Sequence, residues 1–145
     1  MFALLLLFSC SRNEVFFAFQ PIPSNGWGVK DTLFFRPVIE DTVSAYDVFI
    51  EVRNDNRYAY QNLWLYVTDS IGKDSLQTVP VEVLLANDFG KWNGKGFSFV
   101  YELSVPYLQN IRFPHAGEYP IAIRHGMEND PLAGIKNIGV RIVKL

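Results

Sequence analysis

The sequence contains almost none of the residues that build disulfides or metal sites. Its 145 residues include one cysteine, Cys10, and two histidines. A single thiol cannot form an intramolecular disulfide, so a folded domain must rely on its hydrophobic core. His115 and His125 lack the i, i+4 spacing of a helical zinc motif, and no second cysteine completes a zinc site. We therefore expect no metal site and no cofactor, and we place both histidines at the surface or the rim.

The sequence also lacks an excess of charge and a long apolar run. It has 13 basic and 15 acidic residues, a formal net charge of −2, and no long cluster of either sign. Such a chain has no electrostatic footprint for nucleic acid. The apolar run from Phe2 to Phe8 is soon followed by the polar group from Ser11 to Glu14, whereas a transmembrane helix needs about 20 apolar residues. A hydrophobic content of 49% excludes disorder.

Motifs for catalysis are missing as well. The chain has no Gly-x-Ser-x-Gly elbow, and the glycine-rich run from Gly90 to Gly96 lacks the following helix that would bind a phosphate. We interpret that run as a hairpin loop. A glycan-cleaving enzyme would need two acids about 5 to 10 Å apart, and a sequence with 15 acids singles out no pair. We therefore predict that the protein is not an enzyme.

Cys10 stands where a bacterial lipoprotein signal would place it. It follows the apolar run and the small residue Ser9, and such a signal needs a thiol that takes up diacylglycerol at this position. Phe8 is bulkier than the usual residue, and no Lys or Arg precedes the run, so the alternative is a hydrophobic N-terminus with a buried free cysteine. We predict a signal segment over residues 1–10 with lipidation at Cys10, and one domain over residues 11–145.

Alternation of apolar and polar residues dominates the chain after residue 14. In the segment 45–53, Val48, Ile50 and Val52 share one face, while Asp47 lies on the other. This period of two predicts a half-buried antiparallel strand. Similar segments are predicted as strands at residues 15–20, 32–39, 61–68, 78–85, 97–103, 119–124 and 138–143.

Turn signals separate these strands, at residues 24–26, 54–56, 71–74, 93–94 and 114–117. The spacing predicts an all-β fold: an antiparallel β-sandwich of about eight strands, with either a jelly-roll or an immunoglobulin-like Greek-key topology. Pro80, Pro106 and Pro120 interrupt strand-like runs and therefore predict edges or bulges. At most one short helical turn is expected, over residues 128–132, with Asp130 as its cap and Pro131 at its first position.

Aromatic residues give the main functional lead. On a continuous strand, Tyr60, Asn62 and Trp64 would share one face opposite an aliphatic face. Two apolar faces fit either a central core strand or a strand whose outer face meets a partner. Trp92 lies in a loop between glycines, where few neighbours would bury it, and an exposed Trp is a plausible anchor for protein or sugar. Candidate partner-binding residues are therefore Trp92, Tyr60, Asn62 and Trp64.

An ordered series of motifs extends over nearly the whole chain. It consists of Cys10, Asn25-Gly26-Trp27, Arg53-Asn54 leading through Tyr58 and Tyr60 to Asn62-Leu63-Trp64, Gly90-Lys91-Trp92-Asn93-Gly94-Lys95-Gly96, Phe113-Pro114 with Gly117-Glu118-Tyr119, Met127 with Asp130-Pro131-Leu132-Ala133-Gly134-Ile135, and Gly139-Val140-Arg141-Ile142. Each motif alone is weak evidence of a family, but their order and spacing together are specific. In this series the chain resembles the gliding-motility lipoprotein GldH family of Bacteroidetes.

The resemblance implies a membrane-anchored accessory protein for surface gliding, in organisms whose gliding machinery is tied to type IX secretion. It implies envelope proteins of that machinery as partners, no enzyme activity, and no site residue beyond a lipidated Cys10. Surface-exposed lipoproteins of this group often carry several acids after the cysteine, whereas residues 11–14 contain one. We therefore expect a protein anchored to the outer membrane and facing the periplasm.

Two function hypotheses follow from these observations. The first is a non-catalytic binding component of the gliding machinery. The alternative is a carbohydrate-binding module of the cell envelope, because aromatic side chains on a β-sandwich can stack on sugars. A flat row of exposed Trp and Tyr would favour the alternative. Burial of Trp64 and Trp92 in the core would count against it.

Overall fold

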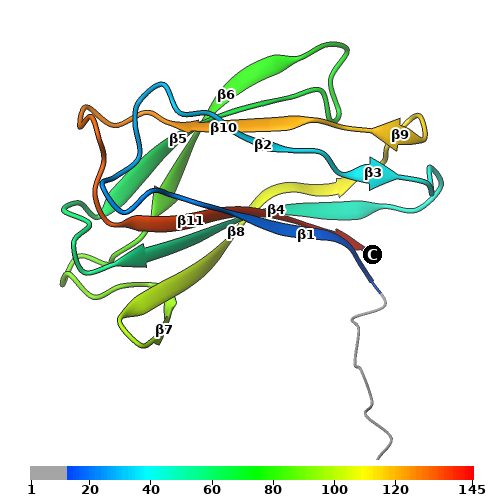
Figure 1. Ribbon diagram of the computed structural model, residues 1–145. Helices are drawn as coiled ribbons and strands as arrows, with labels where there is room; N and C mark the ends of the chain where they lie inside the picture. The colour runs from blue at the N-terminus through cyan, green and yellow to red at the C-terminus, as the bar shows by residue number, and fades with distance from the viewer. Residues whose placement is uncertain (1–12) are drawn as a thin grey trace, which may run out of the picture.

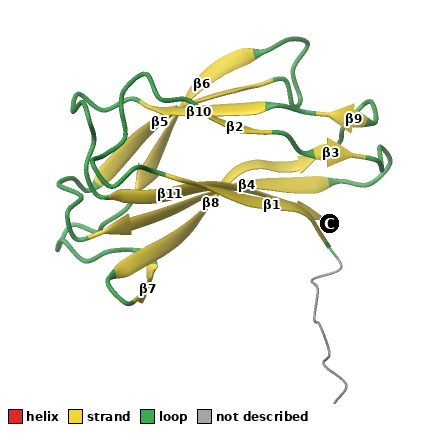
Figure 2. Ribbon diagram, viewed as in Figure 1, coloured by secondary structure: helices red, strands yellow, loops and turns green. Residues whose placement is uncertain are grey.

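The computed structural model describes residues 13–145, and Figures 1 and 2 show that its regular structure consists of strands. The strands are β1 (Glu14–Pro21), β2 (Leu33–Phe35), β3 (Val38–Ile39), β4 (Tyr46–Asp55), β5 (Asn62–Asp69), β6 (Gln77–Leu84), β7 (Lys95–Phe97), β8 (Val100–Ile111), β9 (Gly117–Glu118), β10 (Ile121–His125) and β11 (Ile135–Lys144). Within residues 13–145 there is no helix, and so no helical segment that could cross a membrane.

The strands form two packed sheets, as Figure 1 shows. One sheet has five strands in the order β1-β11-β4-β8-β7, and the other has four in the order β2-β10-β5-β6. The short pair β3-β9 continues the β2-β10 pairing beyond Pro37 and Pro120, which interrupt both strands at the same level. Every pairing is antiparallel. The predicted all-β antiparallel sandwich is therefore confirmed.

The connectivity distinguishes between the two predicted topologies. If β2 with β3, and β9 with β10, are each counted as one strand and the short β7 is set aside, eight long strands remain. Numbered along the chain, they lie in the order 1-8-3-6 in one sheet and 2-7-4-5 in the other. This is the order of a jelly roll, which nests two Greek keys in two sheets. The immunoglobulin-like alternative is not the topology observed.

The core forms where the alternating strands place their apolar residues. On β4, Val48, Ile50 and Val52 are buried between the sheets as predicted, and Asp47 faces outward. On β5 the inward face consists of Leu63, Leu65 and Val67, all fully buried. Burying such aliphatic side chains stabilises the fold by about 1.5–3 kcal/mol each. Both strands are flanked by a neighbour on each side, which explains their strong patterning.

Prolines mark the edges and irregular points of the sheets, as the sequence predicted. Pro80 lies in β6, an edge strand of the four-stranded sheet. Pro106 lies in β8 beside a register shift, because Val48 pairs with Leu108 whereas Phe49 pairs with Pro106. Proline lacks the N–H that a central ladder requires, so these positions tolerate it.

One strand prediction is wrong, and the single helical turn that the sequence allowed is absent from residues 128–132. The segment 97–103 is not one strand, because Ser98 and Phe99 have φ values of 48° and 70° and form the turn between β7 and β8. The helical turn allowed over residues 128–132 does not form either. Asp130 Oδ1 instead accepts the backbone N–H of Val29 at 3.1 Å, and Leu132 bridges to Trp27 through two backbone hydrogen bonds of 2.8 Å. Contacts with a distant loop thus replace local capping.

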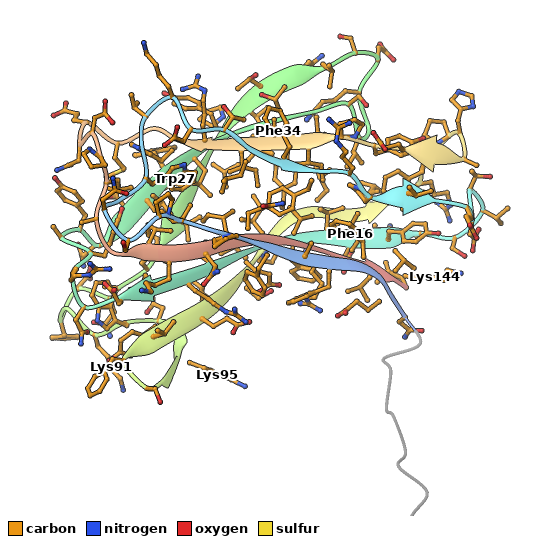
Figure 3. All side chains as sticks on the ribbon, viewed as in Figure 1. Phe16, Trp27, Phe34, Lys91, Lys95 and Lys144 are labelled. Carbon is orange, nitrogen blue, oxygen red and sulfur yellow. The ribbon has the colours of Figure 1, made fainter. Side chains whose placement is uncertain are left out.

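The two ends of the sandwich differ in what they carry. At one end β1 begins and β11 ends, with Glu14 paired to Val143 (Figure 1). We call this the N-terminal end; it also carries the loops 40–45 and 112–116. At the opposite end lie segments 22–32, 56–61, 85–94 and 126–134 and the turn at 98–99, which we call the loop end. Figure 3 shows Trp27 and Lys91 at the loop end and Lys144 at the N-terminal end.

Candidate functional site

The loop end is built on a buried aromatic foundation. Trp27 is fully buried, and its Nε1 donates to the Asp31 carbonyl at 2.7 Å. The Trp27 ring packs edge-on against the His125 ring, with centroids 5.2 Å apart. Gly26 permits this approach: its φ is 111°, and a Cβ there would lie 2.8 Å from Pro131. The segments 22–32 and 126–134 are therefore locked to each other and to the core.

His125 is part of that foundation and not a surface residue, so its predicted position is wrong. Its side chain is fully buried. Nδ1 accepts the Met127 backbone N–H at 3.1 Å, so Nε2 carries the proton and donates to the Trp27 carbonyl at 3.0 Å. Both ring nitrogens are thus used by the neutral imidazole. Burial, the largest cause, lowers the pKa of His125, and the hydrogen bond with Trp27 opposes this.

Four aromatic rings cross the loop end from one sheet to the other, and we call them the aromatic row. The ring centroids of Tyr60 and Tyr58 are 5.9 Å apart, those of Tyr58 and Trp92 are 6.5 Å apart, and those of Trp92 and Tyr101 are 5.9 Å apart. Tyr58 is buried in the middle of the row and donates its hydroxyl to the Asn62 carbonyl. Its burial raises the pKa of the phenol, which therefore stays protonated.

Trp92 is less exposed than the sequence suggested. It is half-buried, packs between Tyr58 and Tyr101, and its Nε1 donates to Asn56 Oδ1 at 2.9 Å. Its backbone forms a bridge with Ala86. The expectation of a side chain projecting freely between flexible glycines is therefore wrong. Trp92 instead holds the loop 85–94 against the loop that follows β4.

Tyr60 is the exposed member of the aromatic row. Its side chain is 40% exposed, and its hydroxyl donates to Asn129 Oδ1 at 2.6 Å. This hydrogen bond ties the loop 56–61 to the loop 126–134. The phenol ring is thus both accessible and fixed, which is what a contact residue needs if it is to bind without losing much conformational freedom.

Trp64 and Asn62 occupy the outer face of β5, beside the row. The Trp64 side chain is 38% exposed, and its backbone N–H contacts Met127 Sδ at 3.3 Å. Asn62 is half-buried at the start of the same strand. β5 is thus the central strand that the sequence allowed, with an aliphatic side in the core and an outer side on which Trp64 is open to solvent. Of the four candidates, Tyr60 and Trp92 belong to one row, while Asn62 and Trp64 extend it onto the four-stranded sheet.

Two exposed aromatic residues of the loop end are not among the candidates that the sequence offered. Phe89 is 96% exposed within the loop 85–94, and Phe99 is 79% exposed in the turn between β7 and β8. The exposure of Phe99 was not predicted, because the apolar segment 97–103 has the pattern of a strand. Phe89 follows Asn87-Asp88 and precedes Gly90, a turn signal that indicates an exposed side chain. The lipidation candidate Cys10 lies outside the described residues.

A groove of about 610 Å³ crosses the outer face of the five-stranded sheet. At its floor the buried Glu51 accepts hydrogen bonds through Oε1 from Arg141 Nε at 2.9 Å and from Ser104 at 2.8 Å. Glu102 also lines the groove and accepts a bond of 3.1 Å from Arg53. Each carboxylate is thus engaged by an arginine. Among residues 13–145, no group of three His, Cys, Asp or Glu side chains is placed to hold a metal.

Comparison with known proteins gives a consistent family match. The family model described as GldH lipoprotein matches residues 14–142. The chain is 28% identical over 151 residues to the "Gliding motility lipoprotein GldH homolog" of Christiangramia forsetii, covering 99% of this chain and 92% of that protein. It is 27% identical over 149 residues to the "Gliding motility lipoprotein GldH" of Flavobacterium johnsoniae, covering 98% of this chain and 92% of the relative.

Among solved structures, the crystal structure of the infectious bursal disease virus VP2 subviral particle is similar over 91% of this chain and 31% of that chain. The sequence identity is 11% and the TM-score is 0.33. This degree of similarity carries no functional conclusion.

Proposed function

The chain belongs to the GldH lipoprotein family, and from this premise we propose that it acts as a lipid-anchored, non-catalytic binding component of the bacterial gliding machinery. The family match over residues 14–142 is the observation that carries the proposal. The two relatives are gliding motility proteins by name and cover nearly all of this chain. Partners in this proposal are envelope proteins of the gliding apparatus and of the type IX secretion machinery linked to it.

The membrane anchor in this proposal is Cys10, which would become acylated and form the new N-terminus. A single acyl chain binds membranes only marginally, whereas the several chains of a mature bacterial lipoprotein hold it stably. The anchor confines the protein to a surface and so raises its effective concentration for partners there. We propose the periplasmic side of the outer membrane, because residues 11–14 contain a single acid.

The loop end is the contact surface in this proposal. It lies opposite the end at which β1 begins, so a partner can approach it while the protein is anchored (Figure 1). It presents Tyr60, Phe89 and Phe99 to solvent. Aromatic side chains dominate the energetics of protein interfaces because they bury large areas at low entropic cost. Trp92 supports this surface from beneath.

Genetic complementation tests the proposal. Cells that lack the gene should lose gliding, and the wild-type gene should restore it. A Tyr60→Ala, Phe89→Ser double variant should accumulate in the envelope at the wild-type level yet fail to restore gliding, because both side chains are exposed. Leu76→Ser, also at an exposed apolar residue, is the matched control and should restore it. Full gliding with the double variant would contradict a contact role for the loop end.

One observation supports the carbohydrate-binding alternative. Trp64 and Tyr60 are both exposed near the start of β5, as a sugar-stacking platform would require. The half-burial of Trp92 removes the third ring that such a platform was expected to include. Binding of the purified protein to envelope polysaccharide, lost in Trp64→Ala, would favour this alternative over protein contact.

A further inference from the structure

At the N-terminal end of the sandwich, the residues at the start of β1 are hydrogen-bonded to the end of β11. The Lys144 backbone N–H donates to the Asn13 carbonyl at 2.6 Å, and Glu14 pairs with Val143. Asn13 is therefore fixed to the body of the protein. Three residue steps separate it from Cys10, and consecutive Cα atoms are about 3.8 Å apart, so the chain between them can reach at most about 11 Å.

Three exposed valines gather at this end, and we call them the valine face. Val43 is 81% exposed in the loop 40–45, Val38 is 57% exposed on β3, and Val15 is 40% exposed on β1. Val15 and Val38 line a shallow hollow of about 380 Å³, together with Asp41 and Lys144. Val15 and Val38 thus meet at this hollow beside the start of β1, and the Val43 backbone is bonded to Asp41, which lines the same hollow.

The loop that carries Val43 is held in place by polar contacts. Asp41 Oδ1 accepts the backbone N–H groups of Val43 at 2.9 Å and Ser44 at 3.0 Å, while Asp41 Oδ2 pairs with Lys144 Nζ at 2.8 Å. The Val43 carbonyl accepts Arg112 Nε at 3.2 Å. These bonds fix the Val43 backbone on both sides, so its side chain stays exposed to solvent.

Charges around the valine face largely compensate one another. Lys144 is paired with Asp41, and Arg36 is paired with Glu118 at 3.1 Å, while the exposed base Arg112 is offset in charge by the exposed acid Glu40. Such a surface has no excess of basic residues for anionic headgroups. Any attraction to a membrane must therefore come from the valines themselves, at about 25 cal/mol per Å² of apolar surface removed from water.

We propose that the valine face rests directly on the lipid surface, as a second, non-covalent membrane contact beside the acylated cysteine. The inference rests on the proposed lipidation of Cys10, because a tether of about 11 Å makes the bilayer the nearest large surface to these residues. Shallow contact at the headgroup boundary suits three short apolar side chains. It also orients the protein, because β4, with ten residues at about 3.3 Å each, holds the loop end about 30 Å further from the membrane.

Brominated lipids, which quench tryptophan on contact, provide the test. The lipoprotein is reconstituted into phosphatidylcholine vesicles with bromine near the top of the acyl chains, as Val43→Trp and as the matched control Phe89→Trp. Relative to the wild-type background, the tryptophan at 43 should be quenched at least twofold more than that at 89. Equal quenching at both positions, or none at 43, would overturn the proposal.

Two further variants separate membrane contact from simple proximity. Ten Gly and Ser residues inserted between Arg12 and Asn13 should leave the quenching at position 43 nearly unchanged if the face has its own affinity for lipid. If the quenching at position 43 fell to that at position 89, only the tether would be holding the valine face at the membrane. Val15→Ser with Val38→Ser should reduce the quenching at least twofold. Adding anionic lipid should change it little, and a strong dependence on protein density would indicate a second copy as the occupant instead.

Failure of this inference is distinguishable from failure of the proposed anchor. Mass spectrometry of the purified protein shows whether Cys10 carries acyl chains. If it does not, the anchor proposal fails, and the same variants are coupled to a maleimide lipid through Cys10, the one cysteine of the chain. The quenching at position 43 then decides the role of the valine face on its own.

Discussion

The indole Nε1 of Trp92 donates to Asn56 Oδ1 at 2.9 Å, which joins the loop before β7 to the turn after β4. The ring also packs against Tyr58 and Tyr101. This position makes Trp92 a structural support of the loop end as well as a candidate binding residue.

Trp92→Ala should therefore lower the free energy of unfolding by about 1–3 kcal/mol, less than a fully buried Trp would cost. Trp92→Phe keeps most of the ring contact and loses the hydrogen bond, so it should cost about 1 kcal/mol. Urea denaturation of both variants measures the difference. An unchanged midpoint in Trp92→Ala would show that the side chain is a free anchor after all.

The ion pair at the floor of the groove should stabilise the fold more than an ion pair at the surface does. Arg141 is bound to Glu51, whose side chain is 4% exposed, whereas the partners in Arg36–Glu118 are 66% and 45% exposed. Arg141→Met leaves a buried carboxylate without its counter-charge, so it should destabilise the protein by about 1–3 kcal/mol. Arg36→Met should cost less than about 1 kcal/mol. Equal melting temperatures for the two variants would disprove this ranking.

His125 should make the protein sensitive to mild acid. Burial lowers its pKa in the folded state, so the unfolded chain binds a proton first as the pH falls below about 6.5. Stability should then decrease by up to about 1.4 kcal/mol per pH unit until the folded-state pKa is reached. Urea titrations at several pH values measure the slope. An equal slope of unfolding free energy against pH in His125→Gln would show that other groups cause the acid sensitivity.

Lipidation at Cys10 should be visible in the mass of the mature protein. Cys10→Ala should leave a precursor that retains residues 1–9, because the signal peptidase acts only after the thiol is acylated, and globomycin should leave an acylated precursor, because it inhibits that peptidase. Ser11→Ala is the matched control and should be processed normally. A mature, fully soluble wild-type protein without acyl chains would contradict the anchor.

The sequence patterns predicted the sandwich because its central strands alternate so clearly. On β4 and β5 each strand has a neighbour on both sides and one buried face, so residues such as Ile50 and Leu65 carry the period of two. The edges were harder to predict. The turn at Ser98-Phe99 uses two non-glycine residues with positive φ, which sequence preferences assign to strand.

The candidate site was predicted only in part, because its assembly depends on contacts between distant segments. Even-numbered spacing correctly placed Trp64 on the face opposite Leu63, but it could not show that Asn56 would meet Trp92 or that Asn129 would meet Tyr60. His125 resembled a rim residue because it ends a strand beside an arginine. One of the two segments that bury it, that of Trp27, lies 98 residues away along the chain.

The most direct test of the central claim is to place a photo-crosslinking amino acid, benzoylphenylalanine, at Tyr60 in gliding cells. The same substitution at Leu76, which is also exposed, serves as the control. If the loop end is the contact surface, irradiation should join the protein to a specific envelope protein from position 60, at least severalfold more than from position 76. Equal crosslinking from both positions, or a specific product from position 76 alone, would contradict the account.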